Sequence, residues 1–159
     1  MAVSNTYLVP IDFSRGSERA LDYALGMARE RKAKVIVLHV VPAELIHPPI
    51  GKALDFYDVL ARQAREKFRR LAKRKKLQPS DCQLILTRGR NFAEVIVKQA
   101  KKLRATIIVM GSHGRTGVQR WLLGSVAERT LRYADCPVLI VKKSSSNGSG
   151  TNPASSAKR

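Results

Sequence analysis

Cysteines and long apolar runs are both scarce in this chain of 159 residues. Cys82 and Cys136 lie far apart and form neither a C-x-x-C pair nor a metal-type cluster, so we expect free thiols in a reducing compartment. No apolar run approaches the roughly 20 residues that span a bilayer. Residues 1–5 lack the basic and apolar regions that begin a signal peptide. The sequence therefore predicts a cytoplasmic protein with no membrane span.

Acidic residues are also scarce. The chain has 12 Asp and Glu against 30 Lys and Arg, which gives a formal net charge of +18. Such an excess favours solubility and weak attraction to polyanions, but it carries no information about the fold. Much of the positive charge lies in residues 62–76, where Glu66 is the only acid. The apolar positions of residues 60–71 recur at helical spacing and would form the core face of this helix: Leu60, Ala64, Phe68 and Leu71.

The basic helix expected around residues 62–76 has two interpretations. It is either a solvated surface or an electrostatic platform for nucleic acid or an anionic membrane. The sequence contains no helix-turn-helix signature, RNP motif or aromatic stripe that would read bases. Any nucleic acid binding by this helix would therefore be weak, dependent on salt and independent of base sequence.

Short β-rich runs alternate with helical patterns, which indicates βαβ units and a mainly parallel sheet. Five strands are expected, at residues 7–12, 35–41, 83–86, 106–110 and 138–141. Four helices are expected, at residues 17–31, 54–75, 92–103 and 126–133. The run 35–41 is almost wholly apolar and β-branched, as in a strand that is covered on both faces. We therefore predict an α/β fold with an open, doubly wound, Rossmann-like sheet of five parallel strands and helices on both faces.

The length and composition indicate one domain, residues 1–143, followed by a tail. Residues 144–159 consist mainly of Ser, Asn, Gly, Pro and a few basic residues, with almost nothing apolar. Such a segment cannot bury enough surface to offset the entropy lost on ordering. The sequence therefore predicts that 144–159 is a disordered tail.

Glycines punctuate the segment that follows the fourth expected strand. Gly111-Ser112-His113-Gly114-Arg115-Thr116-Gly117 comes first, and Gly124-Ser125 follows at a distance. Ser125 to Glu128 fits a capping box that would start the next helix. Glycines before a helix N-terminus let the backbone approach an anion, and free N–H groups then bind it. The segment is neither a Walker A motif nor a G-x-G-x-x-G motif. From the glycines alone, a phosphate loop and an ordinary tight turn fit equally well.

The spacing in this segment resembles the ATP-binding branch of the universal stress protein family. That branch carries Gly, two residues, Gly, nine residues, Gly and then Ser or Thr, which Gly111, Gly114, Gly124 and Ser125 match. Further stretches that resemble the family are residues 9–14, 38–41 and 136–141, so the resemblance covers about residues 5–142. It implies a stress-response or regulatory protein that binds ATP at the carboxyl edge of its sheet, with Mg²⁺ or Mn²⁺ bridging the phosphates.

The resemblance also implies a set of nucleotide-binding residues. Asp12 would hold the ribose or adenine side of the nucleotide, in a pocket lined by Pro10 and Ile11. Val40 would meet the adenine through its backbone, and Met110 and Gly111 would lie along the nucleoside. The residues implied around the phosphates are Ser112, His113, Gly114, Arg115, Gly124, Ser125 and Val126. Asp12 and Gly111 also close parallel strands, at the edge where open α/β sheets bind ligands.

Several alternatives to this interpretation stay open. Asp12 is also suited to capping the turn into the first helix, and His39 is expected to be a structural histidine. The protein could be a slow ATPase, although no clear general base lies near the glycines, because Asp12 is assigned to the nucleoside and Glu128 to the helix cap. A polyanion-binding protein that uses helix 62–76 is the other alternative. We further expect a homodimer through the short apolar strand 138–141, as relatives commonly form.

Overall fold

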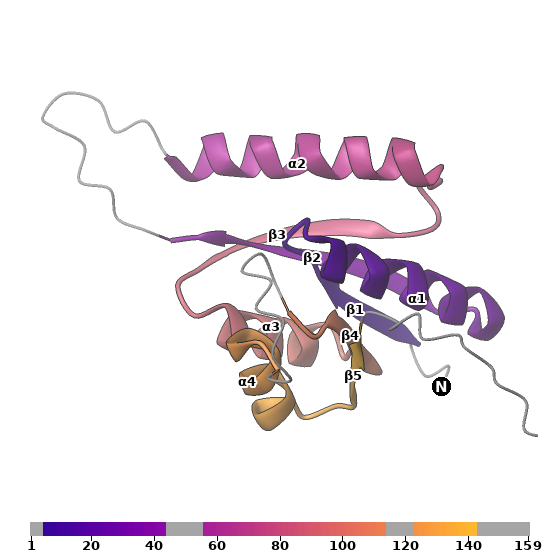
Figure 1. Ribbon diagram of the computed structural model, residues 1–159, viewed down its shortest axis with the longest axis vertical. Coiled ribbons are helices and arrows are strands. Elements are labelled where there is room, and N and C mark those ends of the chain that lie inside the picture. The colour runs from indigo at the N-terminus through magenta and orange to yellow at the C-terminus, as the bar shows by residue number, and fades with distance from the viewer. Residues whose placement is uncertain (1–4, 44–55, 114–122, 143–159) are drawn as a thin grey trace, which may run out of the picture.

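The computed structural model describes residues 5–43, 56–113 and 123–142. Strands and helices alternate along these residues (Figure 1). The strands are β1 (Thr6–Pro10), β2 (Lys34–Pro42), β3 (Gln83–Gly89), β4 (Ile107–Gly111) and β5 (Val138–Val141). The helices are α1 (Arg15–Arg31), α2 (Phe56–Lys75), α3 (Phe92–Lys102) and α4 (Ser125–Tyr133). These elements fall within a few residues of the expected ones. The predicted tail lies outside the described residues.

The strands form one parallel five-stranded sheet in the order β3-β2-β1-β4-β5. After β1 the chain builds one half of the sheet through β2 and β3, and then crosses to β4 and β5 on the other side of β1. The strand order therefore reverses between β1 and β4, where open α/β sheets leave a crevice at the carboxyl ends of their strands. The predicted fold class is confirmed.

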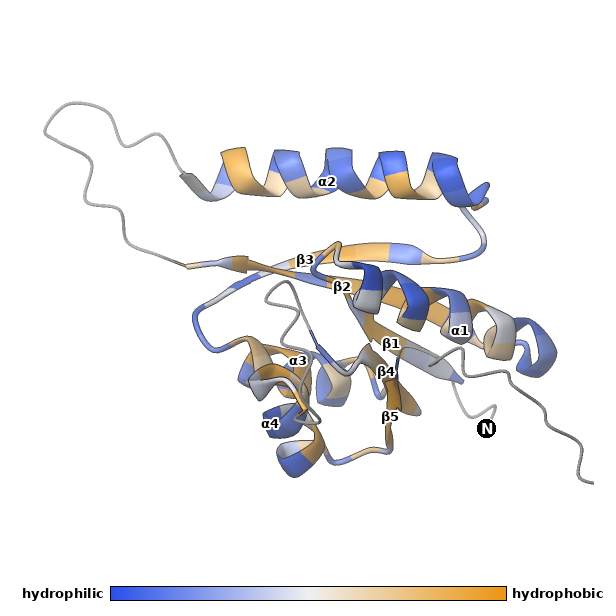
Figure 2. Cartoon of the chain, in the orientation of Figure 1, coloured by the Kyte–Doolittle hydropathy of each residue, from blue (hydrophilic) through white to orange (hydrophobic). Residues whose placement is uncertain are grey.

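Alternate residues of the strands fill two separate cores, one on each face of the sheet. Tyr7 and Val9 pack with Leu21 of α1 and Leu71 of α2. Leu8 points the other way and belongs to the core that contains residues of α3 and α4. Figure 1 accordingly shows α1 and α2 on one side of the sheet and α3 and α4 on the other. Figure 2 shows mostly apolar residues along the inner strands, as expected where helices cover both faces of a sheet.

Helix α1 begins two residues before its expected start because Ser14 caps it. The Ser14 hydroxyl accepts a hydrogen bond from the Ser17 backbone N–H at 3.3 Å, which satisfies one of the free donors of the first turn. Strand β1 correspondingly ends at Pro10 instead of Asp12. Residues 11–14 thus form the turn between β1 and α1, at the carboxyl edge of the sheet.

The basic end of α2 is more fully paired than its sequence suggests. Arg74 contacts Glu18 at 2.5 Å, and the Lys75 ammonium lies 2.7 Å from both carboxylate oxygens of Asp22. Both acids belong to α1, so these two basic side chains join the neighbouring helices instead of extending into solvent. The local sequence shows Glu66 as the only acid within the basic cluster. In the folded protein, Glu18 and Asp22 of α1 also pair with it.

Candidate functional site

A cavity of about 550 Å³ opens at the carboxyl edge of β1, β2 and β4. Its walls also include residues of α2, α3 and the start of α4, so it reaches both faces of the sheet. Every expected site residue that the structure describes lines it: Pro10, Ile11, Asp12, Val40, Met110, Gly111, Ser112, His113, Gly124, Ser125 and Val126. Gly114 and Arg115 lie outside the described residues. Segments from both halves of the sequence thus meet around one cavity.

Asp12 is held by the turn that follows β1. Its Oδ1 accepts hydrogen bonds from the Ser14 backbone N–H at 3.0 Å and from the Ser17 hydroxyl at 2.7 Å. Phe13, which lies between Asp12 and Ser14, has a φ of 64°, a backbone angle that bulky residues rarely adopt. Packing of Phe13 against the core and against the His39 ring, 4.9 Å away between centroids, keeps it there. The carboxylate therefore faces the cavity in one orientation.

The alternative reading of Asp12 is correct in part. Asp12 stabilises the turn into α1, but the residue that caps the helix is Ser14. Among the described residues, the hydrogen bonds to this carboxylate all go to Oδ1, so the structural role does not use the whole group.

Gly111 is needed for packing between β4 and α1. A Cβ at this position would lie 2.8 Å from the Gly16 carbonyl carbon and 2.9 Å from its oxygen. A Cβ on Gly16 would in turn lie 2.8 Å from the backbone oxygen of His113. The atoms in these contacts belong to the backbones of α1 and of the end of β4. Neither backbone can move aside as a flexible side chain would. The first glycine of the expected phosphate loop thus lets α1 approach the end of β4.

The expected capping box at the start of α4 does not form. The N-cap is Gly124, which makes no side-chain cap, and Ser125 is the first helical residue. The Gly124 N–H donates to the Ser112 carbonyl at 2.8 Å, which holds Gly124 in an extended conformation and places Ser125 inside the helix. Glu128 bonds Arg132 at 3.0 Å and does not reach back to the cap. The Ser125 hydroxyl is consequently not used as a cap and lies at the cavity wall.

Ser112 and His113 carry the polar groups at the end of β4. The Ser112 hydroxyl lies 3.0 Å from His113 Nδ1. The other ring nitrogen, Nε2, is buried and has no hydrogen-bond partner within the described residues. A buried polar atom without a partner costs about 1–3 kcal/mol relative to a bonded one. His113 lines the cavity, so a ligand there is a means of satisfying this atom.

The sequence analysis missed the contribution of α2 to this cavity. Leu60, Gln63, Ala64 and Lys67 all line it, and the Lys67 ammonium lies 6.0 Å from the centre of the Phe13 ring. Lys67 belongs to the basic helix that the sequence analysis interpreted as a solvated surface or an electrostatic platform. Helical spacing shows which residues share a face of a helix, but it does not show what that face contacts. His39 has the expected structural role, with Nδ1 2.7 Å from the Ile11 carbonyl, and it also lines the cavity.

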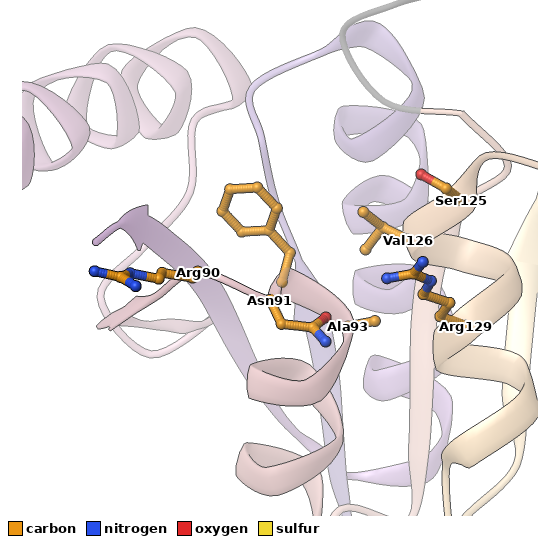
Figure 3. Close-up of a pocket in the computed structure, with 7 residues that line it drawn as sticks. Arg90, Asn91, Ala93, Ser125, Val126 and Arg129 are labelled. Atoms are coloured by element: carbon orange, nitrogen blue, oxygen red, sulfur yellow. The ribbon is translucent and has the colours of Figure 1, made fainter. Parts of the chain in front are cut away.

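A second cavity, of about 340 Å³, lies between the starts of α3 and α4 (Figure 3). It is lined by Arg90, Asn91, Phe92, Ala93, Ser125, Val126 and Arg129. Phe92, Ser125 and Val126 also line the larger cavity. The two cavities therefore adjoin at the first turn of α4.

Neither cysteine forms part of these cavities. Burial, and secondly the Asp81 carboxylate, raise the pKa of the Cys82 thiol. Burial followed by Asp135 likewise raises the pKa of Cys136. A raised pKa lowers the fraction of reactive thiolate near neutral pH, so the structure gives neither thiol the environment of a nucleophile. Both are free thiols, as expected.

The fold and its edge cavity define a doubly wound α/β protein with a ligand crevice at the strand switch point. The family model of the universal stress protein family matches residues 5–142, and the chain belongs to this family. Universal stress protein MJ0531 of Methanocaldococcus jannaschii is 34% identical over 141 residues, covering 86% of this chain and 81% of that protein. Universal stress protein YxiE of Bacillus subtilis is 29% identical over 147 residues, covering 87% and 99%.

Solved structures agree with this membership. The structure of protein MJ0577 superposes with a TM-score of 0.73 at 31% identity, covering 91% of this chain and all of that one. A universal stress protein of Archaeoglobus fulgidus, solved in complex with dAMP, gives a TM-score of 0.62 at 25% identity, covering 88% and 98%. Structures similar to this chain therefore include one with a bound nucleotide. Across the described residues, no helix is long and apolar enough to cross a membrane.

Proposed function

We propose that this protein binds ATP in the larger cavity and acts as a nucleotide-dependent regulatory protein in a stress response. The observation that carries the proposal is the convergence of all described residues of the expected site on one cavity. Its volume of about 550 Å³ falls within the range of about 300–1,000 Å³ that is usual for small-molecule sites. The nucleotide bound by the Archaeoglobus fulgidus relative supports the same class of ligand.

In the proposed complex, each part of the nucleotide meets a different segment. Asp12 would hold the ribose or adenine side, and the backbone of Val40 would meet the adenine. Met110 and Gly111 would lie along the nucleoside. The phosphates would be surrounded by Ser112, His113, Gly114, Arg115, Gly124, Ser125 and Val126. Nε2 of His113, which is buried without a partner among the described residues, would then gain one from the ligand.

A divalent cation, Mg²⁺ or Mn²⁺, would accompany the nucleotide. No group of three or more His, Cys, Asp or Glu side chains in the described parts of the chain is placed to hold a metal ion. The cation would therefore be bound chiefly by phosphate oxygens, which suit hard divalent ions.

The described residues favour binding over rapid hydrolysis. Asp12 already accepts two hydrogen bonds that order its turn, and Glu128 is paired with Arg132. A general base must lie beside the water that attacks the terminal phosphate, whereas we assign Asp12 to the nucleoside side and Glu128 to its pair with Arg132, so neither carboxylate is placed for that task. We therefore propose at most slow ATPase activity, in a cytoplasmic protein that forms a homodimer through β5.

Calorimetry on nucleotide-free protein tests the proposal. We expect ATP binding in the presence of Mg²⁺, and weaker binding for His113→Ala, which removes the unsatisfied ring nitrogen. Gly26→Ala is the control, because a Cβ at Gly26 meets nothing within 4 Å and the residue lies away from the cavity in α1. The proposal is wrong if the folded, nucleotide-free protein shows no affinity for ATP up to millimolar concentration.

A further inference from the structure

The smaller cavity, between α3 and α4, has arginines on two of its walls. Arg90 comes from the connection before α3, and Arg129 comes from α4 (Figure 3). In Figure 3 the Arg129 side chain extends from α4 toward α3, while Arg90 lies on the far side of the start of α3. None of the described residues that line this cavity is acidic. Its walls are therefore electropositive.

The acids nearest to this cavity in sequence are engaged elsewhere. Glu94 of α3 pairs with Lys98 at 2.5 Å, and Glu128 of α4 pairs with Arg132 at 3.0 Å. In both pairs the partner lies one turn further along the helix, away from its start. Within the described residues, Arg129 has no carboxylate within ion-pair distance. Arg90 donates its Nε–H to the Ala43 carbonyl at 3.2 Å, a contact that orients the guanidinium without neutralising it.

The position of Arg129 relative to Ser125 connects this charge to the larger cavity. The two residues are four apart on α4 and so share one face, and side chains of a helix lean toward its N-terminus. The Arg129 guanidinium therefore extends toward the turn where the two cavities adjoin. Arg129 is exposed, and no carboxylate among the described residues pairs with it, so its charge is available to an anionic ligand.

We infer that Arg129 binds the terminal phosphates of the nucleotide and makes the site selective for triphosphates over monophosphates. The inference rests on the proposed nucleotide site and extends it into the second cavity. A nucleotide whose first phosphate lies at Ser112 and Ser125 has its further phosphates near Arg129. A monophosphate ends before it. Arginine is suited to the task because its planar guanidinium binds phosphate oxygens in pairs.

The test compares the affinities of ATP, ADP and AMP for the full chain and for single variants. We expect Arg129→Gln to lower ATP affinity about tenfold or more, the usual cost of one hydrogen bond to a charged group. AMP affinity should stay within about twofold, because AMP does not reach the second cavity. Arg90→Gln should have a smaller effect, because the Arg90 side chain extends away from α4 (Figure 3). Arg129→Lys should retain part of the ATP affinity, because it keeps the charge and loses the paired geometry.

Arg132→Gln is the matched control. Arg132 lies on the same helix, is also exposed, and pairs with Glu128 instead of facing the cavity. This variant should leave the ratio of ATP to AMP affinity unchanged, and circular dichroism establishes that each variant is folded. Equal losses for ATP and AMP in Arg129→Gln, or none for either, would overturn the inference while nucleotide binding stands. Failure of the unmodified protein to bind any of the three nucleotides would overturn the proposed function as well.

Discussion

The residues around Asp12 show how a short turn fixes the direction of a carboxylate at the proposed site. The Ser14 hydroxyl caps α1 by accepting from the Ser17 N–H, and the Ser14 N–H and the Ser17 hydroxyl both donate to Asp12 Oδ1. The same two serines therefore define the helix start and the carboxylate direction. Phe13 remains at a φ of 64° because core packing compensates for the strain. Strained residues of this kind are found where the surrounding structure over-determines them, often at functional sites. The turn is therefore preorganised before any ligand binds.

Gly111→Ala should destabilise the protein by about 1–3 kcal/mol, the usual cost of overpacking a tight contact. The added methyl would meet the Gly16 backbone at 2.8 Å, so either β4 or α1 must shift. Urea denaturation measures the change. Gly26→Ala in the middle of α1 should instead stabilise the protein by about 0.5–1 kcal/mol, because alanine loses less backbone entropy on folding. Unchanged stability of Gly111→Ala would show that the β4–α1 contact can relax.

At the scale of elements, α2 has two functions in the structure. Its apolar side adds Leu71 to the core shared with α1, and Lys67 and Gln63 from the same helix line the larger cavity. Its C-terminal turn is bound to α1 by Arg74 and Lys75. Only part of its positive charge is therefore available to a polyanion, which weakens the alternative of a nucleic acid platform on this helix.

The Lys75–Asp22 pair should contribute to the packing of α2 on α1. Lys75 has only 17% of its side chain exposed, so the pair is less screened than an ordinary surface pair. A double-mutant cycle with Lys75→Met and Asp22→Asn should give a coupling energy of roughly 0.5–1 kcal/mol. The exposed Lys98–Glu94 pair within α3 is the reference, with an expected coupling of about 0.3–0.5 kcal/mol. A coupling for Lys75 and Asp22 no larger than that of the reference pair would contradict this role.

For the whole molecule, the sheet order leaves β3 and β5 at the edges. The four residues of β5 are all apolar and only partly buried in the single chain. Pro137 and Val141 direct their carbonyls toward β4, bonding Ile108 and Ser112 respectively. Because backbone groups alternate along a strand, those of Val138 and Ile140 point away from β4. Within the described residues no further strand pairs with this outer edge, so a second copy of the chain is able to pair there.

Light scattering should accordingly report a dimer at tens of micromolar protein. Ile140→Pro should give a monomer, because proline removes an outward N–H without breaking a bond to β4. Leu139→Pro is the comparison: it removes a bond within the sheet and should lower the thermal stability more. Circular dichroism establishes whether each variant is folded. A monomeric mass for the unmodified protein would exclude the proposed dimer.

Most of the fold was predictable from the sequence because the apolar pattern that distinguishes a helix from a strand is contained in consecutive residues. The run 35–41 predicted a doubly covered strand, and β2 spans Lys34–Pro42 with apolar neighbours on both faces. The predicted ends of helices and strands were less accurate where a contact with a distant residue determines the end. The Gly124 N–H bond to Ser112, for example, moves the cap of α4 from Ser125 to Gly124. No local pattern contains that partner.

The site divides in the same way. The sequence by itself determined the family, the class of fold and the segments that carry the expected site. The glycine spacing and the ends of the strands can be recognised from short stretches of consecutive residues. Only the tertiary structure decided that α2 closes one wall of the cavity, that α1 requires the glycine at position 111, and that Arg129 faces a second cavity beside Ser125. Each of these depends on which surfaces meet after the chain folds, and periodicity shows which residues share a face without showing what that face contacts.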